Sequence, residues 1–155
     1  MFKTINLRKF IISIGITIGV GLLAGLLTRG QMEMFAQMNQ PPLSPPGWVF
    51  GVVWSILYVL MGLALYIVWN GEKDSKGAIL LYAIQLIINF IWPILFFNYG
   101  LYCFSAVWLG LLWIMVFLTT IAFYRQNDIA GKLFLPYLLW CTFALYLNIG
   151  VCVLN

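Results

Sequence analysis

Five long apolar runs, separated by short polar segments, dominate the sequence. A helix needs roughly 20 apolar residues to cross the hydrocarbon core of a bilayer, and each run reaches that length. Transmembrane β-strands would instead alternate apolar and polar residues over about 10 positions, whereas these runs are continuously apolar. The sequence therefore predicts an all-α integral membrane bundle of five transmembrane helices, formed as a single domain over residues 1–155. The predicted spans are residues 10–28, 48–69, 78–97, 103–124 and 133–154.

The composition excludes an ordinary water-soluble domain. Hydrophobic residues make up 64% of the chain and charged residues only 8%, against about 45–50% and about 25% in a typical soluble domain. A soluble fold of this size buries only about 70% of its chain's surface, so the lipid bilayer is the expected solvent.

The first run follows basic residues, as a signal peptide does. It is longer than a signal peptide and no clean small-residue cleavage site follows it, so we expect a retained helix.

The basic residues lie in segments that fall on one side of the predicted bundle. One group precedes the first run, a second separates the second and third runs, and a third separates the fourth and fifth. The opposite side has only Arg29. The positive-inside rule therefore predicts a cytoplasmic N-terminus and an outer C-terminus, and the short segment before the first run suits a bacterial cytoplasmic membrane. The basic residues of the predicted cytoplasmic side are Lys3, Arg8, Lys9, Lys73, Lys76, Arg125 and Lys132.

The residue types also narrow the chemistry. The net charge of +4 comes from basic residues between apolar runs, so no nucleic-acid partner is expected. The chain has no histidine and its acidic residues lie outside the runs, which removes the usual metal ligands and general bases. We expect neither a metal site nor a cofactor. Cys103, Cys141 and Cys152 lie in apolar runs without a CxxC spacing, so we expect buried thiols rather than disulfides or ligands.

Aromatic and amide side chains recur at helical spacing inside three of the runs. One interpretation is a set of interhelical hydrogen bonds, which contribute about 0.6–2 kcal/mol each in a membrane bundle. The other is the wall of an aromatic pocket, which the position of three indoles well inside their spans favours. The stripes consist of Trp54 and Tyr58 in the second run, Gln85, Asn89 and Trp92 in the third, and Tyr137, Trp140, Ala144 and Asn148 in the fifth.

A proline-rich stretch, PPLSPP at residues 41–46, stands directly before the second run. Prolines fix φ near about −65° and disfavour helix in the residues before them. We therefore expect the stretch to hold the first loop in an extended path over one end of the bundle as a lid, with a plain connector as the alternative. Pro93 is expected to kink the third helix. Pro136 is expected in the first turn of the fifth, where its missing N–H costs little.

Three long motifs occur in order along this frame. They are PPLSPPGWVFGVVWSILYVLMGLALYIVW at residues 41–69, QLIINFIWPILFF at residues 85–97 and LFLPYLLWCTFALYLNIGVCVLN at residues 133–155. With them the chain resembles the TspO/translocator protein family, also called the peripheral-type benzodiazepine receptor family. The resemblance covers nearly the whole chain and implies a five-helix bundle, usually a homodimer, with a ligand cavity roofed by the first loop. Motif matching implies as ligand-binding residues Trp54, Tyr58, Asn89, Trp92, Phe104, Trp140, Ala144 and Leu147.

The resemblance also implies a function. Family members bind tetrapyrroles such as protoporphyrin IX, sterols and isoquinoline carboxamides, so we predict a membrane receptor for such ligands, involved in their transport or sensing. A flat ligand suits an aromatic cavity, and porphyrin carboxylates are expected to reach Arg29 at its mouth. The first alternative is an enzyme that degrades protoporphyrin IX with light and oxygen, using Trp54 and Trp140 as catalytic residues. The second is a structural or small-solute transport protein without a tetrapyrrole role.

Overall fold

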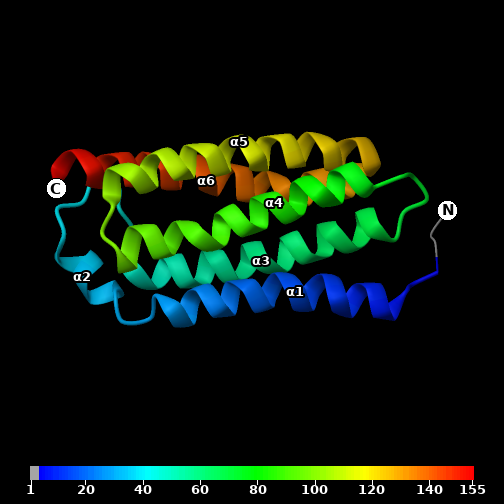
Figure 1. Ribbon diagram of the computed structural model, residues 1–155, viewed down its shortest axis with the longest axis horizontal. Coiled ribbons are helices and arrows are strands. Elements are labelled where there is room, and N and C mark those ends of the chain that lie inside the picture. The colour runs from blue at the N-terminus through cyan, green and yellow to red at the C-terminus, as the bar shows by residue number, and fades with distance from the viewer. Residues whose placement is uncertain (1–3) are drawn as a thin grey trace.

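Helices account for the regular structure of residues 4–155, the part of the chain that the computed structural model describes. Five long helices lie side by side along one axis (Figure 1), and this range contains no strand, which confirms the all-α prediction. The short helix α2 and the C-terminus lie at one end, called here the loop end, and the N-terminal segment lies at the other. The helices are α1 (Leu7–Leu27), α2 (Met32–Gln37), α3 (Gly47–Trp69), α4 (Lys76–Pro93), the π-helix η1 (Ile94–Asn98), α5 (Tyr102–Gln126) and α6 (Asp128–Leu154).

Each of the five long helices, with η1 counted as the continuation of α4, is long and apolar enough to cross a membrane. The large side chains that point outward from their middle turns are apolar, as Ile16, Ile114 and Leu139 illustrate. This is the arrangement of a protein that lipid solvates, since a soluble bundle would place polar residues there. Lys3, one of the residues behind the orientation prediction, lies outside the described residues. The other six basic residues that were predicted on the cytoplasmic side lie at the end opposite the loop end.

The start of α6 differs from the predicted span because Asn127 caps the helix. The Asn127 side chain accepts hydrogen bonds from the backbone N–H groups of Ile129 (2.8 Å) and Ala130 (3.3 Å). Asp128 adds a negative charge in the first turn, where the helix dipole favours one. The helix therefore begins at Asp128 rather than at residue 133, and the prediction for Pro136 is wrong, because this proline lies well inside α6.

Pro93, which was predicted to kink the third helix, is the last residue of α4. Proline cannot donate to the carbonyl one turn earlier and its ring crowds that carbonyl. Instead of a simple kink, the chain continues as the wider π-helix η1, whose pattern includes the bond from the Tyr99 N–H to the Ile94 carbonyl at 3.1 Å. This change of helix type buries Phe96 in the core and leaves Phe97 partly exposed.

Aromatic rings fill the half of the bundle opposite the loop end. Tyr82 stacks on Phe123 with ring centroids 5.8 Å apart, Phe123 meets Phe134 at 4.9 Å, and Phe134 meets Tyr137 at 5.6 Å. The Tyr82 hydroxyl forms a hydrogen bond with Thr17 of α1. Four helices thus meet in a solid packed core, which holds this half of the molecule together.

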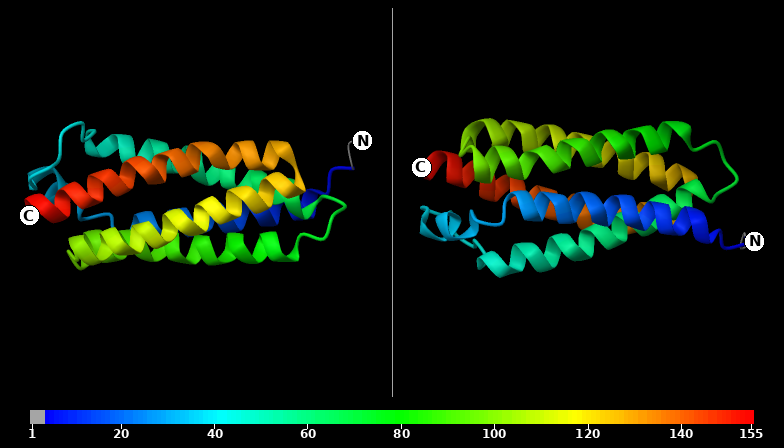
Figure 2. Two further views of the ribbon diagram at one scale, coloured as in Figure 1. Left: turned by 90° about the horizontal axis from the view of Figure 1, so that it is seen from above. Right: turned by 60° about the horizontal axis from the view of Figure 1, so that its bottom comes forward.

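The first loop crosses the loop end of the bundle, close to the C-terminus (Figure 2). We call residues 28–46 the lid. Its helix α2 buries Phe35 against Phe50 of α3 and against Phe96 and Phe97 of η1, with ring centroids 5.3–6.1 Å apart. The loop is therefore packed on the bundle by an apolar anchor and is not a loose connector.

The proline stretch of the lid is fastened to the last turns of α6. Pro41 is buried on Gly150, where a Cβ atom would lie 2.5 Å from the proline ring, so only glycine permits this contact. The Tyr146 hydroxyl donates to the carbonyl of Pro42 at 2.8 Å. The Asn155 side-chain amide donates to the carbonyl of Asn39 at 2.8 Å. The proline stretch of the lid is therefore seated on the end of α6, while Phe35 anchors the lid on α3 and η1.

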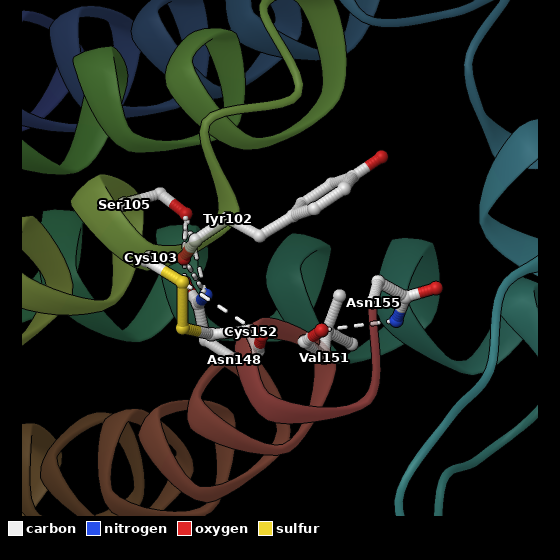
Figure 3. Close-up of a disulfide and its surroundings, with 7 residues drawn as sticks. All are labelled: Tyr102, Cys103, Ser105, Asn148, Val151, Cys152 and Asn155. Carbon is white, nitrogen blue, oxygen red and sulfur yellow. Dashed lines mark hydrogen bonds between the residues drawn. A yellow bond between two sulfur atoms is a disulfide. The ribbon is translucent and has the colours of Figure 1, made fainter.

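A disulfide joins α5 to α6 at the loop end (Figure 3). Cys103 lies in the first turn of α5 and Cys152 near the end of α6, with their Cα atoms 4.8 Å apart. The prediction of free thiols is therefore wrong for this pair, and it holds for Cys141, which is buried and free. The two bonded residues are 49 positions apart, so no local spacing marks them as partners. Only the antiparallel packing of α5 on α6 brings them together.

We expect Gly62→Ala to destabilise the bundle, although alanine favours a helix. The new Cβ would lie 2.9 Å from Ile14 Cδ1 and 3.2 Å from its Cα, so α1 must move away from α3. Overpacking of this kind costs about 1–3 kcal/mol. Gly110→Ala in α5 is the matched control, because a Cβ there meets no atom within 4 Å. Thermal unfolding in detergent, followed by circular dichroism, measures both variants, and equal midpoints would contradict the prediction.

Candidate functional site

A cavity of about 590 Å³ lies in the loop-end half of the bundle, between α1, α3 and α4. Its volume falls in the range of about 300–1,000 Å³ that is usual for small-molecule sites. On its α1 side the wall includes Gly21, where a Cβ would lie 2.5 Å from Tyr58 Cδ2, so a larger residue would displace that ring. Leu22 and Gly51 line the cavity and are also exposed on the outside of the bundle. The cavity therefore opens sideways between α1 and α3, toward lipid.

Aromatic rings form the inner wall of the cavity. The ring of Trp54 lies 5.8 Å from that of Tyr58, one turn later in α3, and 6.4 Å from that of Trp92 in α4. Both pairs are tilted by only about 32–33°. Trp92 in turn stacks on Phe96 at 5.5 Å, which fixes the plane of the indole. Such a wall offers π faces in nearly common orientation, which suits contact with a flat apolar ligand.

Tyr58 and Asn89 form the polar floor of the cavity, and a chain of hydrogen bonds continues from them into the core. The Tyr58 hydroxyl donates to Asn89 Oδ1 at 2.7 Å, and Asn89 Nδ2 donates to the Tyr137 hydroxyl at 2.6 Å. The Tyr137 hydroxyl donates to Gln85 Oε1 at 2.8 Å. All four side chains are buried and come from α3, α4 and α6. Buried polar groups in a bilayer need such partners, so the chain fixes the positions of three helices and of the Tyr58 ring.

A second hydrogen-bonded group holds Trp92 in place. Its indole N–H donates to Asn148 Oδ1 at 2.9 Å. Asn148 Nδ2 donates to the carbonyl of Tyr102 at 2.8 Å and to the Ser105 hydroxyl at 3.2 Å. Asn148 thus links the cavity wall in α4 to the start of α5 and the last third of α6.

The mouth of the cavity lies at the loop end and is amphipathic. Trp48, at the start of α3, is 71% exposed there. Of the described residues that line the cavity, only Arg29 carries a charge. A guanidinium pairs readily with a carboxylate, so the mouth can receive the charged edge of a ligand whose body is apolar.

The predicted ligand-binding residues fall into two groups. Trp54, Tyr58, Asn89 and Trp92 all line the cavity. The other four do not line it. Phe104 is 54% exposed on α5, and Ala144 and Leu147 are buried where α6 packs into the bundle. Trp140 lines a separate groove between α3 and α6. A ligand role for each of the eight residues stays a prediction.

The placement of Trp140 bears on the proposed tryptophan chemistry. Trp54 lines the cavity between α1, α3 and α4, whereas Trp140 lines the groove between α3 and α6. The Trp140 N–H is buried and has no hydrogen-bond partner among the described residues. A buried N–H without a partner lowers the stability of the fold, so Trp140 is the best position outside the cavity at which to test for ligand binding.

The contribution of α1 to the cavity was not predicted from the sequence. This helix supplies Gly21, Leu22 and Gly25, none of which was predicted to line a cavity, whereas Arg29, which lies in the lid, was predicted at the mouth. The four-residue spacing of Gly21 and Gly25 is a signal for close helix approach, but nothing in it indicates a ligand. Groups of three or more His, Cys, Asp or Glu side chains that could hold a metal are not found among the described residues. The chemistry that the cavity offers is binding by π faces, neutral hydrogen-bonding groups and one cation.

The bundle and its cavity define the class of the protein, an integral membrane protein of five spans with an aromatic ligand-sized cavity. Residues 13–154 match the TspO/MBR family, and the chain belongs to this family. It is 36% identical to the tryptophan-rich protein TspO of Chlorobaculum tepidum, with 92% of each chain covered. It is 35% identical to the protein of the same name from Archaeoglobus fulgidus, over 97% of this chain and 99% of that one. The human translocator protein is 36% identical over 76% of this chain and 72% of its own.

We expect Tyr137→Phe to cost more stability than any other single hydroxyl removal in the chain of hydrogen bonds that continues from the cavity floor. It leaves both Asn89 Nδ2 and Gln85 Oε1 without the Tyr137 hydroxyl in a buried site. Each unpaired group costs about 1–3 kcal/mol. Tyr58→Phe removes a single bond, to Asn89, and should cost less. Tyr124→Phe is the control, because its hydroxyl makes no hydrogen bond within the described residues.

Unfolding with a denaturing detergent, followed by circular dichroism, measures the three variants. The expected order of stability is Tyr124→Phe, then Tyr58→Phe, then Tyr137→Phe. A Tyr137→Phe variant as stable as the control would show that the chain of hydrogen bonds does not hold the helices in place.

Proposed function

We propose that the chain is a membrane receptor for flat, amphipathic aromatic ligands of the tetrapyrrole class, with protoporphyrin IX as the representative. The observation that carries the proposal is the cavity that brings Trp54, Tyr58, Asn89 and Trp92 together below Arg29. The names of relatives, which include translocator protein and tryptophan-rich sensory protein, are consistent with a role in transport or sensing. Sterol-like and isoquinoline carboxamide ligands are expected to compete for the same cavity.

The binding mode follows from the chemistry of the wall. The macrocycle would lie against Trp54 and Trp92, whose planes differ by 32°. Its carboxylates would point to the mouth and pair with Arg29, while its apolar edge would face the sideways opening between α1 and α3. The floor needs no ligand partner, because Tyr58 and Asn89 already bond to each other. Affinity would therefore come from stacking and apolar burial, with the carboxylates setting orientation.

The first test of the site is a titration of protoporphyrin IX in the dark, followed by quenching of tryptophan fluorescence. Saturable quenching is expected, and Trp54→Leu should weaken the affinity about three- to tenfold, because an aromatic pair contributes about 0.5–1.5 kcal/mol. Trp113→Phe is the matched control, since Trp113 lies on α5, where its N–H donates to Thr142, and does not line the cavity. Unsaturable quenching, or equal affinity in both variants, would contradict the proposal.

Trp140→Phe in the same titration shows whether the ligand binds in the cavity or in the groove between α3 and α6. An affinity close to that of the unsubstituted protein supports the cavity between α1, α3 and α4. A loss as large as that of Trp54→Leu would place the ligand in the groove that Trp140 lines. Repeating the titration under light in air detects any porphyrin product, and a product that depends on Trp54 would favour the enzymatic alternative.

The role of Arg29 is tested with a pair of ligands that differ only in charge. Arg29→Gln should weaken binding of protoporphyrin IX about two- to fivefold, because an exposed ion pair contributes up to ~1 kcal/mol. It should leave binding of the uncharged dimethyl ester unchanged. Added salt should reduce the difference between the two ligands in the unsubstituted protein. An equal loss for acid and ester would show that Arg29 acts through packing and not through charge.

We also infer the orientation in a bacterial cytoplasmic membrane. The loop end faces outward, because the basic residues gather at the opposite end and the Cys103–Cys152 disulfide belongs in an oxidising compartment. After mild reduction, a membrane-impermeant maleimide should label Cys103 in right-side-out vesicles and not in inside-out vesicles. Cys141→Ser should leave this labelling intact, and Cys103→Ser with Cys152→Ser should abolish it. The reverse sidedness would overturn the orientation.

A further inference from the structure

The end of α6 carries contacts that serve two different parts of the site. The lid is fastened to it at Tyr146, Gly150 and Asn155. On another face of the same turns, Asn148 holds Trp92 of the cavity wall. Whatever fixes the last turns of α6 therefore fixes both the lid and one side of the cavity.

The last turns of a helix fray unless something holds them, because the final carbonyls lack intrahelical partners. Here the Cys103–Cys152 disulfide provides a covalent tie, four residues after Asn148 and two after Gly150. Asn148 also bonds to the carbonyl of Tyr102, the residue before Cys103 (Figure 3). The disulfide and this hydrogen bond thus hold the same two helix ends together.

The disulfide is accessible. Cys103 is exposed and Cys152 is partly exposed, whereas Cys141 is fully buried. A reductant can reach the pair at the loop end without unfolding the bundle, and the aromatic core of the opposite half does not involve it. Exposed disulfides are the ones most open to thiol exchange.

We propose that Cys103–Cys152 is a redox modification site that controls the seating of the lid. A dithiol reductant attacks one sulfur to form a mixed disulfide, and its second thiol then closes on the first to release the protein. The dithiol loses two electrons and two protons, and Cys103 and Cys152 become two thiols. In the oxidised form the end of α6 is fixed and the lid is seated. In the reduced form the end of α6 frays, and the contacts of Pro41, Pro42 and Asn39 with it open more often.

The lid is tested by hydrogen exchange in lipid nanodiscs, with mass spectrometry of peptides that cover residues 38–44 and 146–155. Reduction with dithiothreitol should speed exchange in both segments about tenfold, and reoxidation should reverse it. Exchange in the middle of α4 and α5 should not change. Alkylation in denaturant checks the redox state, because one cysteine reacts in the oxidised protein and three react in the reduced one.

Two variants make the test specific. Cys103→Ala with Cys152→Ala should exchange like the reduced protein and should not respond to dithiothreitol. Cys141→Ala should respond like the unsubstituted protein, since Cys141 is not bonded. Exchange at residues 38–44 that stays the same while alkylation proves reduction would overturn the proposal. It would leave the disulfide as a staple for α5 and α6 alone.

A second readout rests on the proposed function. The rate at which bound protoporphyrin IX leaves in the dark should rise about fivefold on reduction, because the lid crosses the end of the bundle where the mouth lies and Asn148 holds Trp92. An unchanged rate would overturn the link between the disulfide and the cavity. If porphyrin binds in neither redox state, the proposed function fails, and hydrogen exchange still decides whether the disulfide controls the lid.

Discussion

A bilayer offers no water to a buried polar group, and the rest of this structure depends on how the chain meets that constraint. The bonds from Tyr58 to Asn89, Asn89 to Tyr137 and Tyr137 to Gln85 pair four side chains within the bundle. They connect α3, α4 and α6 at one level of the bundle, with packed rings on one side and the cavity on the other. Because the polar groups satisfy one another, the cavity floor is neutral and a ligand need not break a bond to water. The network is at once the support of the fold and the base of the site.

The spans were predictable because every position that faces lipid requires an apolar side chain. Helical spacing grouped four of the eight predicted ligand-binding residues, and these four line one cavity. Trp54 and Tyr58, like Asn89 and Trp92, are three or four residues apart, and that spacing places each pair on one helix face. Which way each face points could not be predicted from spacing, and Phe104 shows this, since it faces outward from α5.

The stripe on α6 shows the limit of the spacing argument in a quantitative way. A helix turns about 100° per residue, so Trp140 lies about 60° around the axis from Tyr137. That difference separates two environments. Tyr137 reaches the chain of hydrogen bonds, while Trp140 lies in the groove beside α3. The prediction of free thiols at Cys103 and Cys152 was wrong for a related reason. Their pairing depends on how the ends of α5 and α6 align and not on their spacing in sequence.

The position of the cavity follows from the lengths of the connections. A short turn joins α3 to α4 and a single residue, Asn127, joins α5 to α6, so these pairs are held together at the end opposite the loop end. At the loop end, residues 99–101 hold η1 close to α5, whereas α1 and α3 are joined there by the long segment 28–46. Among the pairs of helices that follow one another in the described chain, α1 and α3 are therefore the pair most free to separate at its outer turns, and Gly21 and Gly62 keep these two helices in contact further along. A gap can therefore form between α1 and α3 at one end alone, and the segment that permits the gap is also the one long enough to cover it.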